Sequence, residues 1–360
     1  MNLGTKSQLR VAVISLEPWD QVWRRNQHLA TQLIKQGLVS ELFFIEPPIW
    51  AMAPRHGRPM PGIRTIAPTL RLPKRLGGLA PLARQLRSLL RSVDVLWVND
   101  PAFGVHCANW HDRIVYDVTD DWRTFDFPPR IMRRVMAAED RLALEAATVV
   151  CSPVLQSRWR DRYGVDAHLV SNGVDLSVWE RASPILLPGP APHIGYLGTL
   201  HDQRLDVDLV LDLARDARIG TLHLVGPDAL TAASRARLEG SGKVRLHGPV
   251  PAADVAGWGK AMDVLVCPHL VNDFTLSLDA IKAYEYLASG RPFVATPTSG
   301  FQHLDDAVAV RSRDVFVDSV AKAVDGSRIS GDIPTWEACA RQFAQILLAK
   351  TPKPVEVGGL

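Results

Sequence analysis

The chain has 360 residues, more than the ~250 to 300 at which one hydrophobic core stops growing, so two domains are expected. A hydrophobic fraction of 47% and a charged fraction of 22% are typical of soluble globular proteins and exclude a disordered or fibrous chain. The net charge is only +3, which gives no overall reason to expect a polyanionic partner.

The cysteines and the apolar runs bear on the compartment. No apolar run reaches the ~20 residues that a membrane-spanning helix needs, and the N-terminal residues lead directly into a strand rather than a signal peptide. The four cysteines are far apart without a Cys-x-x-Cys pair, which favours buried thiols in a reducing compartment: Cys107, Cys151, Cys267 and Cys339. We therefore expect a cytoplasmic protein.

In the first half, short apolar runs alternate with helical segments, as in parallel sheets with crossover helices. The predicted strands are Val11 to Ser15, Val39 to Ile45, Val95 to Val98, Ile114 to Val118, Val149 to Cys151 and His168 to Val170. The predicted helices between them are Gln27 to Gln36, Leu82 to Arg91, Ile131 to Ala146 and Leu155 to Tyr163.

A Pro- and Gly-rich linker beginning at Ser183 separates this half from a second one of the same kind. Its predicted strands are Ile194 to Leu197, Thr221 to Val225, Val244 to Leu246, Val264 to Cys267, Phe293 to Ala295 and Val308 to Val310. Helices are predicted at Leu278 to Ala288 and, at the end of the chain, at Trp336 to Ala349.

The fold class expected is therefore α/β, with two Rossmann-like domains whose parallel sheets face a central cleft. The domain boundaries predicted are 1–182, 183–334 and a C-terminal helix and tail over 335–360, with the helix crossing back to the first domain. Ligands bind such sheets outside the carboxyl ends of the strands.

Between Pro47 and Val93 the chain has no acidic residue but many basic ones: Arg55, Arg58, Arg64, Arg71, Lys74, Arg75, Arg84, Arg87 and Arg91. One interpretation is a solvated loop and helix face. A sharper one is an anionic membrane surface or lipid-phosphate acceptor, with an apolar face supplied by Leu76, Leu79, Leu82, Leu86, Leu89 and Leu90. Nucleic acid is disfavoured, because interleaved aromatic residues are lacking.

The most informative stretch runs from Asn272 to Gly290. A helix starting near Ser277 would offer the backbone N–H groups of Ser277, Leu278 and Asp279 to a diphosphate. Lys282 and Glu285 are three residues apart and share a helix face, so the ammonium would neutralise phosphate while the carboxylate accepts hydrogen bonds from a ribose diol. The plainer interpretation is an exposed ion pair on a surface helix.

Three ordered motifs resemble GT-B glycosyltransferases, particularly family four. The segment Glu285-Tyr-Leu-Ala-Ser-Gly-Arg-Pro-Phe-Val-Ala-Thr is similar to that family's C-terminal donor-site motif. Asn172-Gly-Val-Asp resembles its interdomain turn, and Ile194-Gly-Tyr-Leu-Gly-Thr resembles the strand and loop that open its donor domain. The similarity spans most of the chain and implies a nucleotide-sugar-dependent enzyme.

The resemblance also implies roles for single residues. It places Glu285 on the donor ribose, Gly198 and Thr199 close to the donor phosphates, and Arg204 against the diphosphate. Retaining members carry a further glutamate eight positions before the ribose one, and Ser277 stands there in this chain. Retention or inversion of the anomeric centre is therefore left open.

On the acceptor side, four carboxylates are candidates for a general base: Asp120, Asp121 and Asp117 near the end of one strand, and Asp20 in the loop after the first strand. Carboxylates that share a site raise one another's pKa, which suits base catalysis near neutral pH. Asp120 is preferred. In the first loop, Trp19 or Trp23 would either stack on a sugar or pack under the first helix.

No metal site is predicted, and no cofactor besides the nucleotide-sugar co-substrate. Asp206-Val-Asp208 imitates a metal-binding Asp-x-Asp, but it stands at a predicted helix start, where carboxylates cap. The function expected is transfer of a sugar to a hydroxyl of a lipid-linked or polysaccharide acceptor, as in cell-envelope biosynthesis, on or near the membrane. The alternatives are a nucleotide-sugar 2-epimerase and a non-catalytic nucleotide-sugar-binding protein.

Overall fold

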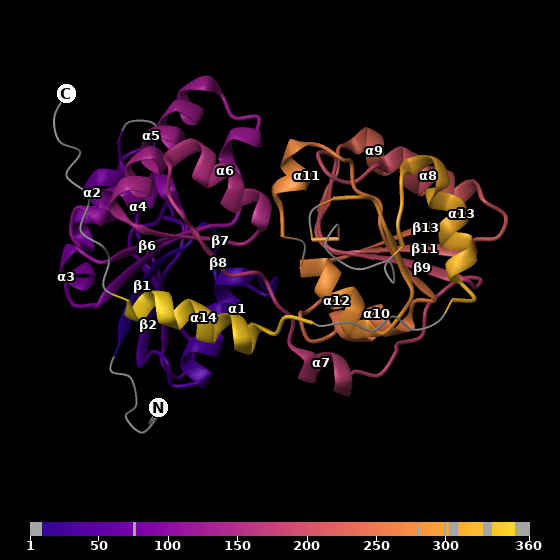
Figure 1. The fold of residues 1–360 in the computed structure, drawn as a ribbon, viewed down its shortest axis with the longest axis horizontal. Helices are drawn as coiled ribbons and strands as arrows, with labels where there is room; N and C mark the ends of the chain where they lie inside the picture. The colour runs from indigo at the N-terminus through magenta and orange to yellow at the C-terminus, as the bar shows by residue number, and fades with distance from the viewer. Residues whose placement is uncertain are drawn as a thin grey trace. The chain divides into compact units, whose positions relative to one another are not determined.

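The structure is a computed structural model that describes residues 9–74, 77–279, 281–298, 300–301, 309–326 and 333–349. It divides into two compact α/β units (Figure 1). The first comprises Met1–Ser171 and Trp336–Leu360, and the second comprises Asn172–Thr335. The predicted positions Arg75, Leu76 and Val308 lie outside the described residues.

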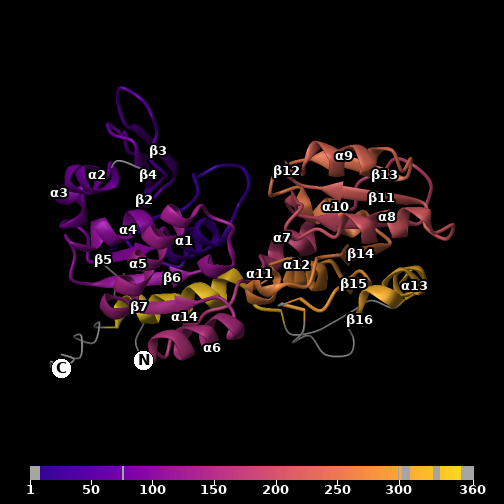
Figure 2. The ribbon, with the colours of Figure 1, turned by 90° about the horizontal axis from the view of Figure 1, so that it is seen from above.

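The first unit contains an eight-stranded sheet of order β3-β4-β2-β1-β5-β6-β7-β8. All neighbours pair in parallel except β3, which is antiparallel to β4 at the edge (Figure 2). The strands are β1 Arg10–Ile14, β2 Glu41–Ile45, β3 Arg55–Met60, β4 Ile63–Ala67, β5 Val95–Val98, β6 Ile114–Val118, β7 Ala147–Val150 and β8 His168–Leu169.

Helices cover both faces of this sheet, as crossover connections require. They are α1 Arg25–Lys35, α2 Leu79–Gln85, α3 Arg87–Leu90, α4 Pro101–Ala108, α5 Pro129–Glu145, α6 Pro153–Tyr163 and α14 Trp336–Leu348. The C-terminal helix α14 lies beside α1, as expected: Trp336 stacks on His28 at 4.6 Å between ring centroids, and Phe343 packs against Trp97 at 4.7 Å.

The second unit has a six-stranded parallel sheet of order β13-β11-β9-β14-β15-β16 and a small pair, β10-β12. Its strands are β9 His193–Leu197, β10 Leu200–His201, β11 Thr221–Val225, β12 Asp228–Ala229, β13 Val244–Gly248, β14 Val264–Cys267, β15 Phe293–Ala295 and β16 Ala309–Val310. Its helices are α7 Leu176–Arg181, α8 Val207–Arg215, α9 Ala232–Glu239, α10 Val255–Ala261, α11 Asp273–Ser277, α12 Ile281–Ser289 and α13 Arg313–Ala323.

The α/β fold class and most predicted strands are confirmed, but the first division of the chain falls at 171/172 rather than at 182. The reason is α7, whose Trp179 is buried in the core of the second unit. A Cβ added at Gly259 would lie only 2.7 Å from the Trp179 ring, so α10 packs directly on it. The Pro-rich segment after α7 is thus a loop of the second unit.

The prediction that the leucines of the basic segment form an exposed apolar face is wrong. Leu82 and Leu90 are fully buried in the core of the first unit, and Leu86 and Leu89 pack against that core. The helix predicted over 82–91 is two short helices that meet at Leu86. The leucines therefore cover the sheet, while Arg84, Arg87 and Arg91 point to solvent.

The remaining general expectations concern cysteines, caps and membrane spans. All four cysteines are buried and free of disulfides, as predicted. Asp206 caps α8 by accepting the N–H of Leu209 at 2.9 Å, which confirms the capping interpretation. Among the helices of the described residues, none has the length and apolar character that a membrane crossing requires.

Candidate active site

The loop after β9 is the first part of the candidate donor site. Here β9 neighbours β11 on one side and β14 on the other, so the direction of the strand order changes between β9 and β14. In open parallel sheets, ligands bind at this switch point, outside the carboxyl ends of the strands. Gly198 follows β9 directly, and its N–H donates to the carbonyl of Val225 at 2.8 Å.

Gly198 has a φ of +137°, a conformation open to glycine, and it lies against Lys282 of α12. A Cβ at Gly198 would stand 2.4 Å from the Lys282 Cε and 2.6 Å from its Nζ. Gly226, with a φ of +144°, has no room for a Cβ either, because one would lie 2.3 Å from the Gly198 carbonyl oxygen. Because Gly198 and Gly226 have no side chains, the Lys282 ammonium lies close to the backbone of the loop after β9.

Lys282 and Glu285 are half-buried on one face of α12. Burial and the charge of Arg204 lower the pKa of Lys282, while burial raises the pKa of Glu285 against the influence of Lys282. Within the described part of the chain, neither side chain takes part in a hydrogen bond or an ion pair. The alternative of an exposed ion pair on a surface helix is therefore wrong.

Arg204 adds a second cation to this place. Its backbone is fixed by the N–H of Leu270, which donates to the Arg204 carbonyl at 2.7 Å. Its Nε is buried without a hydrogen-bond partner. The positive charge of Arg204 contributes to the lowered pKa of Lys282, and neither side chain has an anionic partner among the described residues, which is an arrangement that a bound phosphate would stabilise.

The base of the site is a hydrogen-bonded layer that sequence reasoning missed. The Tyr286 hydroxyl accepts from the N–H of Leu197 at 3.2 Å and donates to the carbonyl of Val266 at 3.0 Å, so it fixes α12 to the ends of β9 and β14. His269, after β14, is hydrogen-bonded through Nε2 to the Tyr196 hydroxyl at 3.0 Å. Burial lowers the pKa of His269 well below its usual value, so its imidazole is neutral.

The predicted helix start at Ser277 is wrong. Ser277 is the last residue of α11, and its hydroxyl donates to the carbonyl of Phe274 at 2.8 Å. Leu278 is extended, with φ −66° and ψ 154°, and α12 begins only at Ile281. The amides at Ser277 and Leu278 therefore do not form the N-terminal turn of the helix that carries Lys282, and the Ser277 side chain is buried.

In the first unit, two of the four candidate carboxylates are occupied by arginines. Asp117 is fully buried in β6 and receives the Arg25 Nε at 3.1 Å. Asp121 caps the short 3₁₀ helix Trp122–Thr124 and pairs with Arg158 at 3.0 Å and Arg162 at 3.5 Å. Both carboxylates are therefore held in place by ion pairs with arginines of the same unit.

The other two candidates remain accessible. Asp120 is half-buried and accepts the Thr119 hydroxyl at 2.9 Å. Asp20 is exposed and pairs with Arg24 at 3.2 Å. Burial raises the pKa of Glu17, Arg24 lowers it, and the charges of Asp20 and Asp120 raise it further. Glu17, missed as a candidate, thus shares one electrostatic environment with Asp20 and Asp120 beyond the ends of β1 and β6.

The aromatic residues of the first loop pack internally. Trp19 meets Phe44 edge to face at 5.0 Å and Trp23 at 6.0 Å, and Trp23 meets His28 at 5.2 Å. The backbone N–H of Trp19 also donates to the Glu46 Oε1 at 3.0 Å. These contacts favour the packing interpretation over stacking on a sugar.

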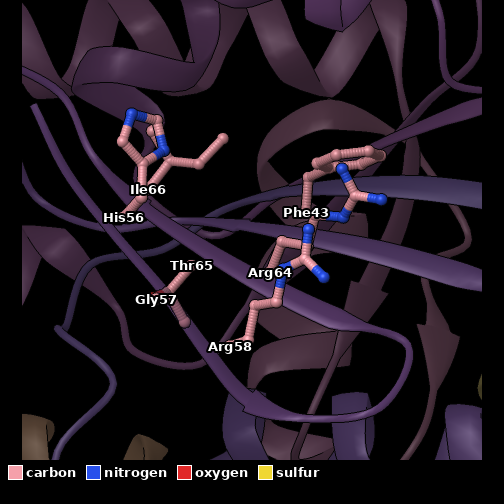
Figure 3. Close-up of a pocket in the computed structure, with 7 residues that line it drawn as sticks. All are labelled: Phe43, His56, Gly57, Arg58, Arg64, Thr65 and Ile66. Carbon is pink, nitrogen blue, oxygen red and sulfur yellow. The ribbon is translucent and has the colours of Figure 1, made fainter.

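A hollow of about 610 Å³ on the first unit is unrelated to these residues (Figure 3). It lies over β2, β3 and β4, and its lining comprises Phe43, His56, Gly57, Arg58, Arg64, Thr65 and Ile66. Phe43 and Arg64 face each other in mid-strand rather than at the carboxyl ends. The hollow is therefore no part of either candidate site.

Known proteins resemble both halves of the chain. Residues 22–178 match the model described as Glycosyltransferase Family 4, and residues 191–326 match the model for Glycosyl transferases group 1. A curated relative, the putative teichuronic acid biosynthesis glycosyltransferase TuaH of Bacillus subtilis (strain 168), is 24% identical over 328 residues, which is 82% of each chain.

Solved structures agree in fold. Sucrose-phosphate synthase from Thermosynechococcus elongatus matches with a TM-score of 0.71 at 17% identity, over 94% of this chain and 98% of that one. Anabaena Alr3699/HepE, solved in complex with UDP and glucose, matches with a TM-score of 0.67 at 14% identity, over 95% and 99%. Together with the ordered motifs, these matches show that the chain is a glycosyltransferase of the GT-B fold, related to family four.

Proposed function

We propose that this glycosyltransferase takes its sugar from a nucleoside diphosphate donor bound by the second unit. The observation that carries the proposal is the set of charged side chains at α12 and the β9 loop that have no hydrogen-bond or ion-pair partner among the described residues. Lys282 and Arg204 supply the positive charge that a diphosphate requires, and the absence of a side chain at Gly198 lets the Lys282 ammonium lie against the β9 loop. HepE, which binds UDP-glucose, has the same fold.

Glu285 is assigned to the donor ribose. A carboxylate accepts two hydrogen bonds from a vicinal diol, and burial raises its pKa when no such partner is present. Tyr286, the next residue, fixes α12 to both central strands, so Glu285 is presented on a rigid element. Thr199 lies in the loop after β9. Its carbonyl accepts a hydrogen bond from the Tyr196 hydroxyl at 3.2 Å, which fixes the backbone of that loop.

The reaction proposed is transfer to a hydroxyl group of a lipid-linked or polysaccharide acceptor. The acceptor oxygen bonds to the anomeric carbon while the bond from that carbon to the diphosphate oxygen breaks. The hydroxyl proton passes to a carboxylate of the first unit, with Asp120 as the preferred acceptor and Glu17 or Asp20 as the alternatives. The negative charge that develops on the leaving diphosphate is stabilised by Lys282 and Arg204, so no metal ion is invoked.

A binding survey tests the donor class. Saturation-transfer NMR of the full chain with UDP-, GDP-, ADP- and dTDP-sugars is expected to show contacts to the ribose and base of one nucleotide, competed by the matching nucleoside diphosphate. The absence of binding by every nucleotide sugar, with folded protein in the same tube, would contradict the proposal.

The polysaccharide setting is supported by the relative TuaH, whose name places it in teichuronic acid biosynthesis. We also propose that the first unit contacts an anionic membrane surface through the basic stretch Arg55 to Arg91. Leu79, Leu82 and Leu90 of that stretch are buried and Leu86 and Leu89 are half-buried, so its exposed arginines are the main part of the predicted surface that remains.

A further inference from the structure

Four large apolar side chains of the first unit are exposed in loops that follow parallel strands. Trp50 is 66% exposed and Met52 97%, both after β2; Leu72 is 49% exposed, after β4; Ile131 is 48% exposed, at the start of α5 after β6. Exposed groups of this size that gather at one edge mark an interaction surface more often than scattered ones do. We call the surface formed by these four apolar side chains, together with the flanking basic residues Arg130 and Arg133, the apolar rim.

A β-bridge and hydrogen bonds to backbone carbonyls join these loops to one another. Ile49 forms a parallel bridge with Thr69, and the N–H of Leu70 donates to the Ile49 carbonyl at 2.8 Å. The Arg134 guanidinium of α5 donates to the Lys74 carbonyl at 2.9 Å. The loops after β2 and β4 and the start of α5 are therefore one connected structure.

The surroundings of the rim are basic. The loops from Pro47 to Lys74 contain no acidic residue. The first turn of α5 has no acidic residue either, although Arg130 stands there against the helix dipole and Arg133 follows in the next turn. Of the nearby acids, Glu46 is buried and paired with Arg55 at 3.0 Å, and Asp126 is exposed in the loop before α5. A cationic helix start of this kind calls for an anionic partner.

We infer that the apolar rim inserts into the interface of an anionic lipid bilayer, with Arg130 and Arg133 on the headgroups. Tryptophan and methionine side chains flanked by arginine suit the boundary between headgroups and acyl chains. Charge complementarity favours anionic lipid, because basic residues add to the apolar contribution only there.

The rim lies at the same edge of the sheet as the proposed acceptor carboxylates, since β1, β2, β4 and β6 are parallel. Glu46 links the two: one oxygen accepts the Trp19 N–H of the acceptor loop, and the other pairs with Arg55 beside the rim. Resting on the proposed function, the inference therefore specifies the acceptor as an amphiphile that is glycosylated at the membrane plane.

Vesicle sedimentation of the full chain tests the inference without any substrate. The wild type is expected to bind phosphatidylglycerol-containing vesicles much more strongly than phosphatidylcholine vesicles. The variant Trp50→Ser with Met52→Ser should bind about tenfold more weakly, because both exposed side chains lose their apolar surface. Arg130→Gln with Arg133→Gln should bind about 25-fold more weakly, since each basic residue contributes about fivefold.

Matched controls come from the second unit. Leu186 is 99% exposed, and Arg181 and Arg245 are exposed arginines. Leu186→Ser and the pair Arg181→Gln with Arg245→Gln should bind like the wild type. Equal binding to both kinds of vesicle, or rim variants that match their controls, would overturn the inference.

Two further outcomes are decisive. If the arginine pair abolishes binding while Trp50→Ser with Met52→Ser does not, and heparin competes, the surface is a general polyanion site and the bilayer proposal fails. UDP affinity, measured on the same variants, should be unchanged. Vesicle binding by a wild type that binds no nucleotide sugar would overturn the proposed donor while leaving the membrane contact in place.

Discussion

The two units treat their charged residues in opposite ways. In the first unit, Asp117 and Asp121 sit at the carboxyl ends of strands but are satisfied by arginines from elsewhere in the same unit. In the second unit, Lys282 and Glu285 occupy a comparable position and have no such partner within the described residues. Charged residues that form ion pairs within a unit stabilise its fold. Charged residues that are half-buried and have no ion-pair partner indicate a binding site.

The largest effect expected is on turnover. Asp120→Asn should lower the rate by about 10²- to 10⁴-fold, the usual cost of losing a general base, while nucleoside diphosphate affinity stays the same. Asp121→Asn is the control variant for turnover, because it alters the neighbouring carboxylate, which is paired with Arg158 and Arg162. Asp120→Asn activity within a few-fold of the wild type would move the proton acceptor to Glu17 or Asp20.

A stability measurement separates paired from accessible carboxylates. Asp117→Asn leaves the Arg25 charge buried without its partner and should lower the free energy of unfolding by about 3 to 5 kcal/mol. The control, Asp20→Asn, breaks an exposed pair with Arg24 and should cost at most about 1 kcal/mol. Similar losses in both variants, measured by urea unfolding, would remove the distinction drawn here.

The pH dependence of stability provides a signature of the second unit. His193, His223 and His247 form a chain of ring-nitrogen hydrogen bonds across β9, β11 and β13, with N···N distances of 3.1 and 3.0 Å. Burial, followed by the charges of its neighbours, lowers the pKa of His223 to about 4. The unfolded chain therefore binds more protons, and unfolding free energy should fall as pH drops from ~6.5 toward 4, by no more than about 3 kcal/mol.

His223→Gln checks the origin of that slope. The variant should show a flatter dependence over the same pH range, because the group with the displaced pKa is gone. Unfolding of the wild type that is independent of pH between 6.5 and 4 would show that the histidine chain does not resist protonation.

A smaller effect is expected at Glu285. Glu285→Ala should weaken nucleoside diphosphate binding about tenfold or more, since charge-assisted hydrogen bonds are worth ~1.5 to 3 kcal/mol. Stability should not fall, because this carboxylate has no hydrogen-bond or ion-pair partner among the described residues. Asp279→Ala is a useful contrast: Asp279 accepts the N–H of Asn172 at 2.5 Å, so its loss should destabilise the fold. Unchanged affinity in Glu285→Ala would place the ribose elsewhere.

Local patterns were sufficient to predict much of the donor unit. The apolar runs at β9, β11 and β14 mark buried parallel strands, and the spacing of Lys282 and Glu285 marks one helix face. The helix start was misplaced because Ser277 and Leu278 are compatible with a helix in isolation. Only the three-dimensional contacts of Ser277 and Asp279 separate α11 from α12.

Other features depend on distant parts of the chain and could not be inferred from sequence alone. The partner of Asp117 is Arg25, 92 positions away. The β3–β4 hairpin lacks apolar alternation in β3, where only Gly57 and Met60 are even half-buried. The helical spacing of the leucines in α2 and α3 is the same for a helix that faces lipid and for one that packs on a sheet. In the structure these leucines pack on the sheet of the first unit.

The most direct test of the account is calorimetry of UDP binding to the wild type and to Lys282→Met, which keeps the length of the side chain and removes its charge. We expect the wild type to bind UDP and Lys282→Met to bind it at least tenfold more weakly. Stability should be maintained, because the ammonium has no ion-pair partner in the described chain. If a different nucleoside diphosphate is preferred in the NMR survey, the same comparison applies to it. Equal affinity of the two proteins for the nucleoside diphosphate would contradict the placement of the donor site.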